Sequence, residues 1–277
     1  MVLFAEKMKI FKPRLILLVQ FDIIRGELLN ELFFTREALP MRRRGLIRKE
    51  RAPCNFLGGP MKKTIAYIDG YNLYYGLLKG HPESKWLDLS ALVKKLLRPD
   101  HEIAGIKFFT ARIRPYPQDI AAVERQKIYL QALASLGHVE IVEGFYNKKK
   151  TWAPHVNAKC RDCNEARYGM ARVVRLEEKR SDVNLAVNAM LDAARNKADC
   201  FMIITGDSDQ AGTIEALRYE FGKSVLVFNP HATVSDHLKR VSSYYTHIQP
   251  GVLAECQMPD VISLANGRTI HRPPAWA

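Results

Sequence analysis

Short apolar runs alternate with helically spaced apolar residues along most of this 277-residue chain. A run of roughly four to eight apolar residues between polar or glycine residues predicts a strand, and apolar residues that recur about every three or four positions predict a helix. The predicted strands are Thr64–Ile68, Ile106–Ala111, Val139–Tyr146, Cys200–Thr205 and Ser224–Phe228. The predicted helices are Asn72–Leu78, Ser90–Leu97, Pro117–Leu136, Asp182–Arg195 and Gln210–Phe221.

This alternation predicts the fold class. Strands that are apolar on both faces, with helices between them, are typical of a parallel sheet covered by helices on both sides. We therefore expect an α/β fold with a mainly parallel central sheet. The alternation fades after Val241, and we expect Met258–Ala277 to be a weakly ordered tail.

Two stretches depart from the pattern. Residues 1–60 contain apolar clusters and the run Arg42–Arg44 but no sustained period, and residues 147–181 combine a lysine run with a pair of cysteines. The first stretch is either a basic RNA-binding arm or, as we favour, an upstream extension before Met61 that is non-native or disordered. The second indicates an inserted hairpin or a small knuckle. The expected organisation is an extension over 1–60, a folded domain over 61–248 with an insertion over 147–181, and a tail over 249–277.

Composition and charge narrow the classes of protein. The chain is 47% hydrophobic and 26% charged, which excludes a largely disordered protein, and no apolar run reaches the roughly 18–20 residues of a membrane span. Lys and Arg outnumber Asp and Glu by 42 to 29, which gives a net charge of +13, and residues 1–60 carry 12 and 6 of these residues. The excess favours a polyanionic partner, with nucleic acid as the first candidate and no membrane.

The cysteines do not form a disulfide framework. Five of them are scattered along the chain, which favours a reducing compartment and predicts a cytoplasmic protein. Cys160 and Cys163 form a single CxxC pair, and His155 lies shortly before it. The segment is either a structural Zn²⁺ knuckle, whose fourth ligand comes from elsewhere, or a pair of unligated thiols, and the sequence leaves both alternatives open.

Carboxylates follow two of the predicted strands. Asp69 comes directly after the first strand, Asp207 and Asp209 follow the fourth, and Asp182 stands at the start of a predicted helix. Because sites in parallel sheets form at the carboxyl ends of the strands, we expect the four to converge. Converging carboxylates raise one another's pKa unless a cation binds, and Mg²⁺ or Mn²⁺ prefers such oxygen ligands. Each aspartate alone is better explained as a helix cap or turn residue; the four together favour a metal site.

A site of this kind has a definite chemistry. One or two such ions can activate a water and neutralise charge on a phosphodiester. We expect Asp69 and Asp207 to be direct ligands, with Asp182 and Asp209 completing the shell partly through water. Ser208 and the backbone amides near Gln210 are placed to hold a phosphate at the start of the next helix. No Ser/His or Cys/His grouping suggests a protein nucleophile.

Three blocks of the sequence carry a family resemblance. TIAYIDGYNLYYG, EEKRSDVNLAVNAMLDAA and MIITGDSDQAGTIEALR resemble the signature blocks of the NYN domain, in the LabA-like branch of the PIN-like nucleases. They lie in the expected order over about residues 62–235. The resemblance implies a Rossmann-like, three-layer fold whose acidic cluster binds Mg²⁺ or Mn²⁺ and cleaves RNA, with an endonuclease as the expected mode. The oligomeric state stays open, a homodimer being one alternative.

The resemblance also implies residue roles. The metal ligands would be Asp69, Asp182, Asp207 and Asp209. Asn72 would bond to a carboxylate or to substrate, although it is equally a natural cap for the helix that follows it. Lys179 would contact a phosphate. Gln210 departs from the family pattern, in which a bulky apolar residue is common, and this difference concerns packing more than chemistry.

Other polar and aromatic residues have two interpretations each. Lys148, Lys149 and Lys150 lie between Tyr146 and Trp152, a combination that suits single-stranded RNA but is also typical of a solvated hairpin tip. Of the three tyrosines near Asp69, we expect two in the core and one facing substrate; they are Tyr71, Tyr74 and Tyr75. The scattered histidines are expected to be ordinary loop or surface residues; they are His81, His101, His138, His231 and His237.

The leading hypothesis is therefore a metal-dependent ribonuclease. The main rival is a non-catalytic RNA-binding or regulatory module, which would gain affinity for a polyanion by losing its aspartates. A HAD-type phosphatase is disfavoured because Tyr71 stands where its second aspartate is needed. A Rossmann dehydrogenase and a P-loop NTPase are disfavoured because their glycine-rich fingerprints are missing.

Overall fold

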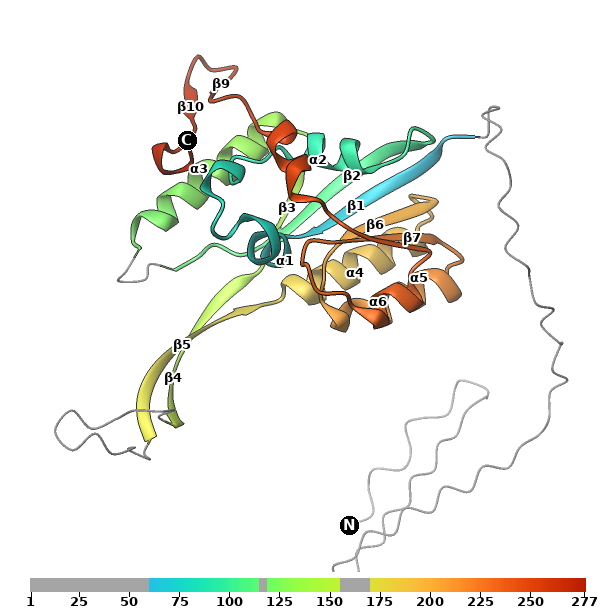
Figure 1. Cartoon of the computed structure of the whole chain (residues 1–277), viewed down its shortest axis with the longest axis horizontal. Coiled ribbons are helices and arrows are strands. Elements are labelled where there is room, and N and C mark those ends of the chain that lie inside the picture. The colour runs from blue at the N-terminus through green and yellow to red at the C-terminus, as the bar shows by residue number, and fades with distance from the viewer. Residues whose placement is uncertain (1–59, 115–118, 155–169) are drawn as a thin grey trace, which may run out of the picture. The chain divides into compact units, whose positions relative to one another are not determined.

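Six parallel strands form the central sheet in the part of the chain that the computed structural model describes, residues 60–114, 119–154 and 170–277 (Figure 1). In spatial order they are β3 (Glu140–Glu143), β2 (His101–Thr110), β1 (Lys62–Asp69), β6 (Cys200–Ile204), β7 (Ser224–Asn229) and β8 (Tyr244–His247). All neighbouring strands in this sheet pair in parallel. The predicted α/β fold with a parallel central sheet is confirmed, as is the Rossmann-like architecture.

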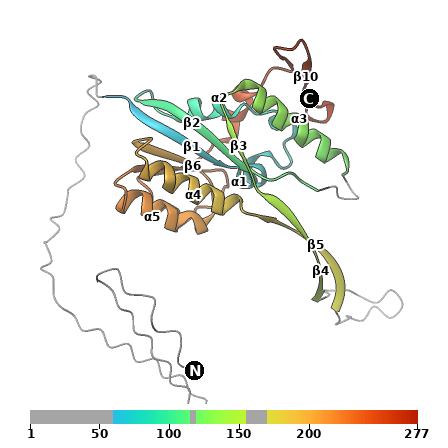
Figure 2. The same cartoon turned by 180° about the vertical axis from the view of Figure 1, so that it is seen from behind.

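Helices cover both faces of the sheet (Figures 1 and 2). One face packs against α1 (Gly70–Leu73), its π-helical continuation η1 (Tyr74–Leu78), α2 (Leu89–Leu96) and α3 (Ala121–Leu136). The other face packs against α4 (Ser181–Ala194), α5 (Ala211–Tyr219) and α6 (Asp236–Val241). Side chains of β1 alternate between the two cores, with Ala66 and Ile68 in the first and Ile65 and Tyr67 in the second. None of the helices in the described ranges is long and apolar enough to cross a membrane.

The strand order reverses between β1 and β6. The chain builds outward from β1 to β2 and β3, and then returns to the other side of β1 to continue with β6, β7 and β8. In a sheet of this kind a crevice forms outside the carboxyl ends of the strands at the reversal point. Asp69 is the last residue of β1, and Thr205 directly follows β6. The fold thus brings the two aspartate-bearing segments to one place.

An antiparallel hairpin projects from the sheet edge (Figure 1). It consists of β4 (Phe145–Pro154) and β5 (Met170–Lys179). Of the two alternatives for the insertion, a hairpin or a small knuckle, the described residues form a hairpin. The single strand predicted over Val139–Tyr146 is wrong, because β3 and β4 are separate strands joined at Gly144. A β-carbon on Gly144 would lie 2.5 Å from the Lys179 carbonyl oxygen. The chain leaves the sheet where the returning strand passes too closely for any side chain.

The C-terminal segment is ordered, so the weakly ordered tail predicted over Met258–Ala277 is wrong. After β8 the chain forms the 3-10 helix η4 (Pro250–Cys256), the small hairpin of β9 (Val261–Ser263) and β10 (Thr269–His271), and the 3-10 turn η5 (Pro274–Trp276). Met258 and Ile262 are buried in the core that α2 and α3 share, and Trp276 packs against it. Buried Trp86 donates its ring N–H to the Pro259 carbonyl oxygen (2.9 Å). These apolar anchors are widely spaced, and so they leave no periodic pattern in the sequence.

Candidate active site

Asp69 lies at the centre of the crevice and is 2% exposed. Its Oδ1 accepts hydrogen bonds from the backbone N–H groups of Tyr71 (3.1 Å) and Asn72 (3.0 Å), so it caps α1. Its Oδ2 accepts hydrogen bonds from Asn72 Nδ2 (2.5 Å) and Thr205 Oγ1 (3.2 Å). Burial raises the pKa of Asp69 above its ordinary value despite these bonds, because every one of the donors is neutral. The four bonds use the carboxylate's acceptor positions.

Asn72 joins the two sides of the crevice. Besides its bond to Asp69, its Oδ1 accepts a hydrogen bond from the Gly206 N–H (3.1 Å) and lies 3.1 Å from His231 Nε2. Of the two alternatives that the sequence left open, the structure has the bond to a carboxylate, while the helix cap is Asp69. The amide therefore fixes the ends of β1 and β6 relative to each other.

The segment after β6 presents Asp207 and Asp209. The backbone N–H of Asp207 donates to Thr205 Oγ1 (3.1 Å), and Asp207 Oδ1 accepts from the backbone N–H of Asp209 (3.0 Å). Asp207 thereby caps the short 3-10 turn η3 (Ser208–Gln210), on which Ser208 and Asp209 are exposed. Gln210 is buried and donates through Nε2 to the Asp182 carbonyl oxygen (3.3 Å). The polar residue at this position thus links the segment to α4.

Asp182 lies in the first turn of α4. Partial burial and the negative charges of neighbouring carboxylates raise its pKa to about 6; these neighbours are Asp69, Asp207, Glu178 and Asp209. The effect indicates that the crevice concentrates negative charge as the sequence predicted. The predicted set omitted Glu178, although it lies just before Asp182 in the sequence; its Oε1 accepts from the N–H (3.1 Å) and hydroxyl (2.7 Å) of Ser181.

The donor set suits a hard divalent cation, because carboxylate oxygens are the ligands that Mg²⁺ and Mn²⁺ prefer. In residues 60–114, 119–154 and 170–277, however, no three His, Cys, Asp or Glu side chains lie close enough together to hold an ion among themselves. Mg²⁺ usually keeps several waters and binds through one or two carboxylates. The spread of the carboxylates is compatible with that mode, and the saturated oxygens of Asp69 make it a poorer direct ligand than predicted.

His231 is a site residue that the sequence interpretation missed. It was expected to be an ordinary loop residue, yet its ring reaches Asn72 across the crevice. The backbone N–H of His231 donates to Asn229 Oδ1 (2.8 Å), and its backbone carbonyl oxygen lies 2.7 Å from His247 Nδ1. The available signal was its position two residues after the end of β7, at the same carboxyl edge as the aspartates.

The lysines predicted to bind substrate lie on the hairpin. Lys148, Lys149 and Lys150 are exposed in the middle of β4, so they are not at a hairpin tip. Lys179 ends β5, where its Nζ pairs with Glu177 Oε2 (3.2 Å). The predicted zinc-site residues lie outside the described residues; they are His155, Cys160 and Cys163.

The tyrosines near Asp69 do not enter the core as predicted. Tyr74 is 38% and Tyr75 is 55% exposed, and Tyr71 is half-buried with its hydroxyl donating to the Ala111 carbonyl oxygen (3.1 Å). The cause is the π-helical turn η1, whose wider spacing departs from the 3.6-residue period that the prediction assumed. All three tyrosines line a cavity of about 300 Å³ beside the crevice.

A family model and a named relative both match most of this chain. A model of the NYN domain matches residues 63–249. A 6-hydroxy-3-succinoylpyridine 3-monooxygenase of Pseudomonas putida (strain DSM 28022 / S16) is 32% identical over 237 residues, which cover 77% of this chain and 75% of that relative.

Two solved structures are similar only in part. A protein of unknown function from Vibrio parahaemolyticus RIMD 2210633 has a TM-score of 0.42 at 17% identity, with 70% of this chain and 97% of that chain covered. A Sir2 homolog in complex with NAD has a TM-score of 0.26 at 13% identity, with coverage of 70% and 88%. Function therefore has to be argued from this chain's own residues. The family match, which spans β1 to the end of β8 and includes the crevice, shows that the chain belongs to the NYN domain family, a PIN-like nuclease family.

Proposed function

We propose that this protein is a metal-dependent ribonuclease that hydrolyses RNA phosphodiester bonds in the crevice at the ends of β1 and β6. The observation that carries the proposal is that hydrogen bonds hold the segments of Asp69, Asp207 and Asp182 together: Thr205 joins Asp69 to Asp207, and Gln210 joins the Asp207 segment to the Asp182 backbone. The raised pKa of Asp182 is consistent with the negative charge gathered there. A cluster of carboxylates is unfavourable unless a cation joins it. A divalent ion bound in the crevice would neutralise the carboxylates, and its remaining positive charge would attract the phosphodiester.

The chain's residues divide into two groups under this proposal. Asp207, Asp182 and Asp209 would supply one or two direct carboxylate ligands to Mg²⁺ or Mn²⁺, and the rest of them would reach the ion through water. When bound, the ion supplies an activated water and neutralises charge on the phosphodiester. Asp69 and Asn72 position the ends of the strands through their mutual hydrogen bonds. His231 orients Asn72 from the opposite side and bonds to no carboxylate of the residues that the structure describes.

One face of the β4–β5 hairpin supports an RNA substrate. Side chains alternate along a strand, so Lys148 and Lys150 share a face with Trp152, and Lys149 lies on the other. Trp152 is 63% exposed, and on β5 the cross-strand partner of Trp152 is Arg172. The three cations on this face are Lys148, Lys150 and Arg172. None of them forms an ion pair with a carboxylate of the described residues. Exposed cations beside an aromatic ring suit phosphates and stacked bases.

The other face of the hairpin carries less free charge. Lys149 is paired across the strands with Arg175, and Glu177 lies 3.7 Å from Arg175 and 3.2 Å from Lys179 in their closest N–O distances. This carboxylate neutralises part of the positive charge. The hairpin therefore offers a matched internal comparison between its two faces.

The main experiment is an RNA-cleavage assay with Mn²⁺, Mg²⁺ or EDTA. We expect cleavage with either ion, none with EDTA, and a loss of about 100-fold or more in Asp207→Asn. The control is Asp100→Asn, because Asp100 is an exposed aspartate before β2, at the opposite end of the sheet. Activity that survives both EDTA and Asp207→Asn contradicts the proposal. RNA binding without cleavage under any metal condition would favour the non-catalytic module.

The hairpin provides a second experiment, with uncleaved RNA in EDTA. Replacing Lys148 and Lys150 by alanine should weaken RNA binding about tenfold and lower its salt dependence by roughly two phosphate contacts. Replacing Lys149 and Arg175 by alanine removes the same formal charge from the other face and should change binding much less. Equal losses in the two double variants would show that only net charge matters.

A second candidate function comes from the name of the Pseudomonas putida relative, which describes oxygenation of a succinoylpyridine. The observation that favours it is the aromatic-lined cavity beside the crevice. Oxygen uptake with 6-hydroxy-3-succinoylpyridine and a reduced nicotinamide or flavin as electron donor distinguishes the two. If oxygen uptake persists in Asp207→Asn and the wild type does not cleave RNA, the second candidate function is favoured.

A further inference from the structure

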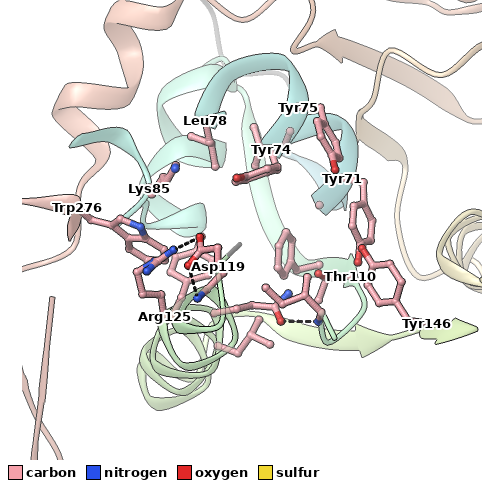
Figure 3. Close-up of a pocket in the computed structure, with 18 residues that line it drawn as sticks. Tyr71, Tyr74, Tyr75, Leu78, Lys85, Thr110, Asp119, Arg125, Tyr146 and Trp276 are labelled. Carbon is pink, nitrogen blue, oxygen red and sulfur yellow. Dashed lines mark hydrogen bonds and ion pairs between the residues drawn. The ribbon is translucent and has the colours of Figure 1, made fainter. Parts of the chain in front are cut away.

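The cavity of about 300 Å³ adjoins the acidic crevice but has a different character (Figure 3). It lies between α1 with η1 on one side and α3 on the other, and Tyr71, which follows the crevice residue Asp69 closely in the chain, is part of its wall. Tyr74, Tyr146 and Trp276 add aromatic surface from three separate segments. Its volume is at the lower end of the range for small-molecule sites.

Three polar residues that line the cavity, Tyr71, Gln126 and Tyr129, are paired with backbone. The Tyr71 hydroxyl and Gln126 Nε2 both donate to the Ala111 carbonyl oxygen, at 3.1 and 3.0 Å. Gln126 Oε1 accepts from the Ile113 N–H (2.9 Å), and the Tyr129 hydroxyl donates to the backbone of the loop before α2 (2.9 Å). These three residues therefore offer a ligand mainly ring and aliphatic surface.

Charge gathers at one side of the cavity. Figure 3 shows Lys85, Arg125 and Asp119 on the side of Trp276, opposite Tyr71 and Tyr146. Arg125 Nη2 pairs with Asp119 Oδ2 (2.5 Å), whereas Lys85 Nζ lies 5.6 Å from the ring centroid of Tyr74. Lys85 has no carboxylate partner within the described ranges, so this side carries a net positive charge.

We propose that the cavity binds a small planar aromatic carboxylate, with its ring between the tyrosines and its carboxylate at Lys85 and Arg125. An aromatic ring matches walls that include Tyr71, Tyr74 and Tyr146, and one anion matches the net charge. A nucleobase fits less well, because the polar groups of Tyr71, Gln126 and Tyr129 that could bond to its Watson–Crick edge are already bonded to backbone. The inference does not depend on RNA hydrolysis, since the cavity and the crevice use different residues.

The test is calorimetric titration of the metal-free, full-length protein with benzoate and 2-naphthoate. We expect saturable binding of one molecule per chain and binding about tenfold weaker for the matched neutral amides, benzamide and 2-naphthamide. No saturable binding of either acid, or equal binding of acids and amides, overturns the proposal. Tighter binding of AMP than of the acids would assign the cavity to a nucleobase and also overturn it.

Matched variants locate the site. Lys85→Met should weaken binding of the acids about tenfold, while Lys79→Met should not, because Lys79 lies over the Tyr75 ring (4.9 Å) but is not among the cavity-lining residues. Tyr74→Ala is a second variant on an exposed position, and it should weaken binding of both acids and amides. Asp207→Asn should bind the acids normally, which separates this site from ribonuclease activity. Equal binding by Lys85→Met and Lys79→Met would contradict the assigned orientation.

Discussion

Two aspartates in this protein are equally buried and have opposite electrostatic surroundings. Asp69, in the crevice, is 2% exposed, and Asp192, near the end of α4, is 1% exposed. Asp192 accepts hydrogen bonds from Lys107 Nζ (2.7 Å), Lys197 Nζ (2.9 Å) and the Tyr67 hydroxyl (2.9 Å). Burial alone would raise its pKa, but these partners lower the pKa below its ordinary value. Asp69 has only neutral donors, and its pKa is raised.

The difference separates a structural carboxylate from one that needs an external partner. The chain supplies two ammonium groups to Asp192, which neutralise it within the fold. It supplies none to Asp69, and it adds Asp182 and Asp207 to the same crevice. The fold thus compensates the charge of buried Asp192 but not that of Asp69, although Asp69 ends the strand that carries Tyr67. The unfavourable negative charge is concentrated where a cation is expected to bind.

The largest expected effect concerns stability without metal. Asp192→Asn leaves Lys107, whose side chain is 12% exposed, without its closest anion, and we expect a loss of about 3 kcal/mol in the free energy of unfolding. Asp69→Asn removes an uncompensated charge and keeps an oxygen for the α1 cap, but its amide nitrogen would face the donor Asn72 Nδ2, so it should cost about 1–2 kcal/mol, less than Asp192→Asn. Urea denaturation in EDTA measures both. Equal losses would show that the two aspartates do not differ in this way.

A smaller effect is expected from metal binding. At Mn²⁺ about ten times its dissociation constant, the wild type should gain about 1.4 kcal/mol of stability. The variant Asp207→Asn should gain much less, and Asp100→Asn should respond like the wild type. Thermal unfolding with and without Mn²⁺ gives the comparison. Stabilisation of all three proteins to the same extent would place the ion elsewhere.

The smallest effect is a difference in pH dependence. Because the folded-state pKa of Asp192 is lowered, its stabilisation is present above the unfolded value of about 3.9 and is lost as the pH falls through the folded value. For Asp69 the sign is reversed: its contribution is complete below the unfolded pKa and is lost as the pH rises through the raised value. As the pH falls from 7 toward 4 in EDTA, the wild type should therefore gain stability relative to Asp69→Asn. Below about pH 4 the wild type should lose its greater stability relative to Asp192→Asn. If the stability of the wild type and of the two variants changes with pH in the same way, both predicted directions are wrong.

Regular elements were predictable from sequence because their residues are buried at a fixed period. The strands around Ile68 and Ile203 are apolar on both faces, and this alone indicates a covered parallel sheet. The positions of Asp69 and Asp207 directly after such strands predicted the crevice. Asp192 could not be predicted, because its lysine partners on β2 and after α4 are brought to it only by the fold.

Other errors had local causes. The strand pattern continues through Phe145 and Tyr146, so nothing apolar marks the break at Gly144. His231 also follows a strand, but the prediction of the site considered only the acidic residues at strand ends. Tyr74 and Tyr75 were assigned to a regular helix, and only the π-helical turn turns them toward the cavity.

The junction at Gly144 has a consequence for how this protein can vary. Its absent side chain leaves room for the Lys179 carbonyl oxygen, the Glu178 carboxylate and the Ser181 hydroxyl, all within 3.0 Å of where a β-carbon would stand. Arg180 then turns the chain into α4 in a left-handed conformation (φ 83°). Both strands of the hairpin are thus anchored at its base, next to Asp182. Evolution or design can lengthen, shorten or replace the distal hairpin and change which RNA is held, while the position of the aspartates stays the same.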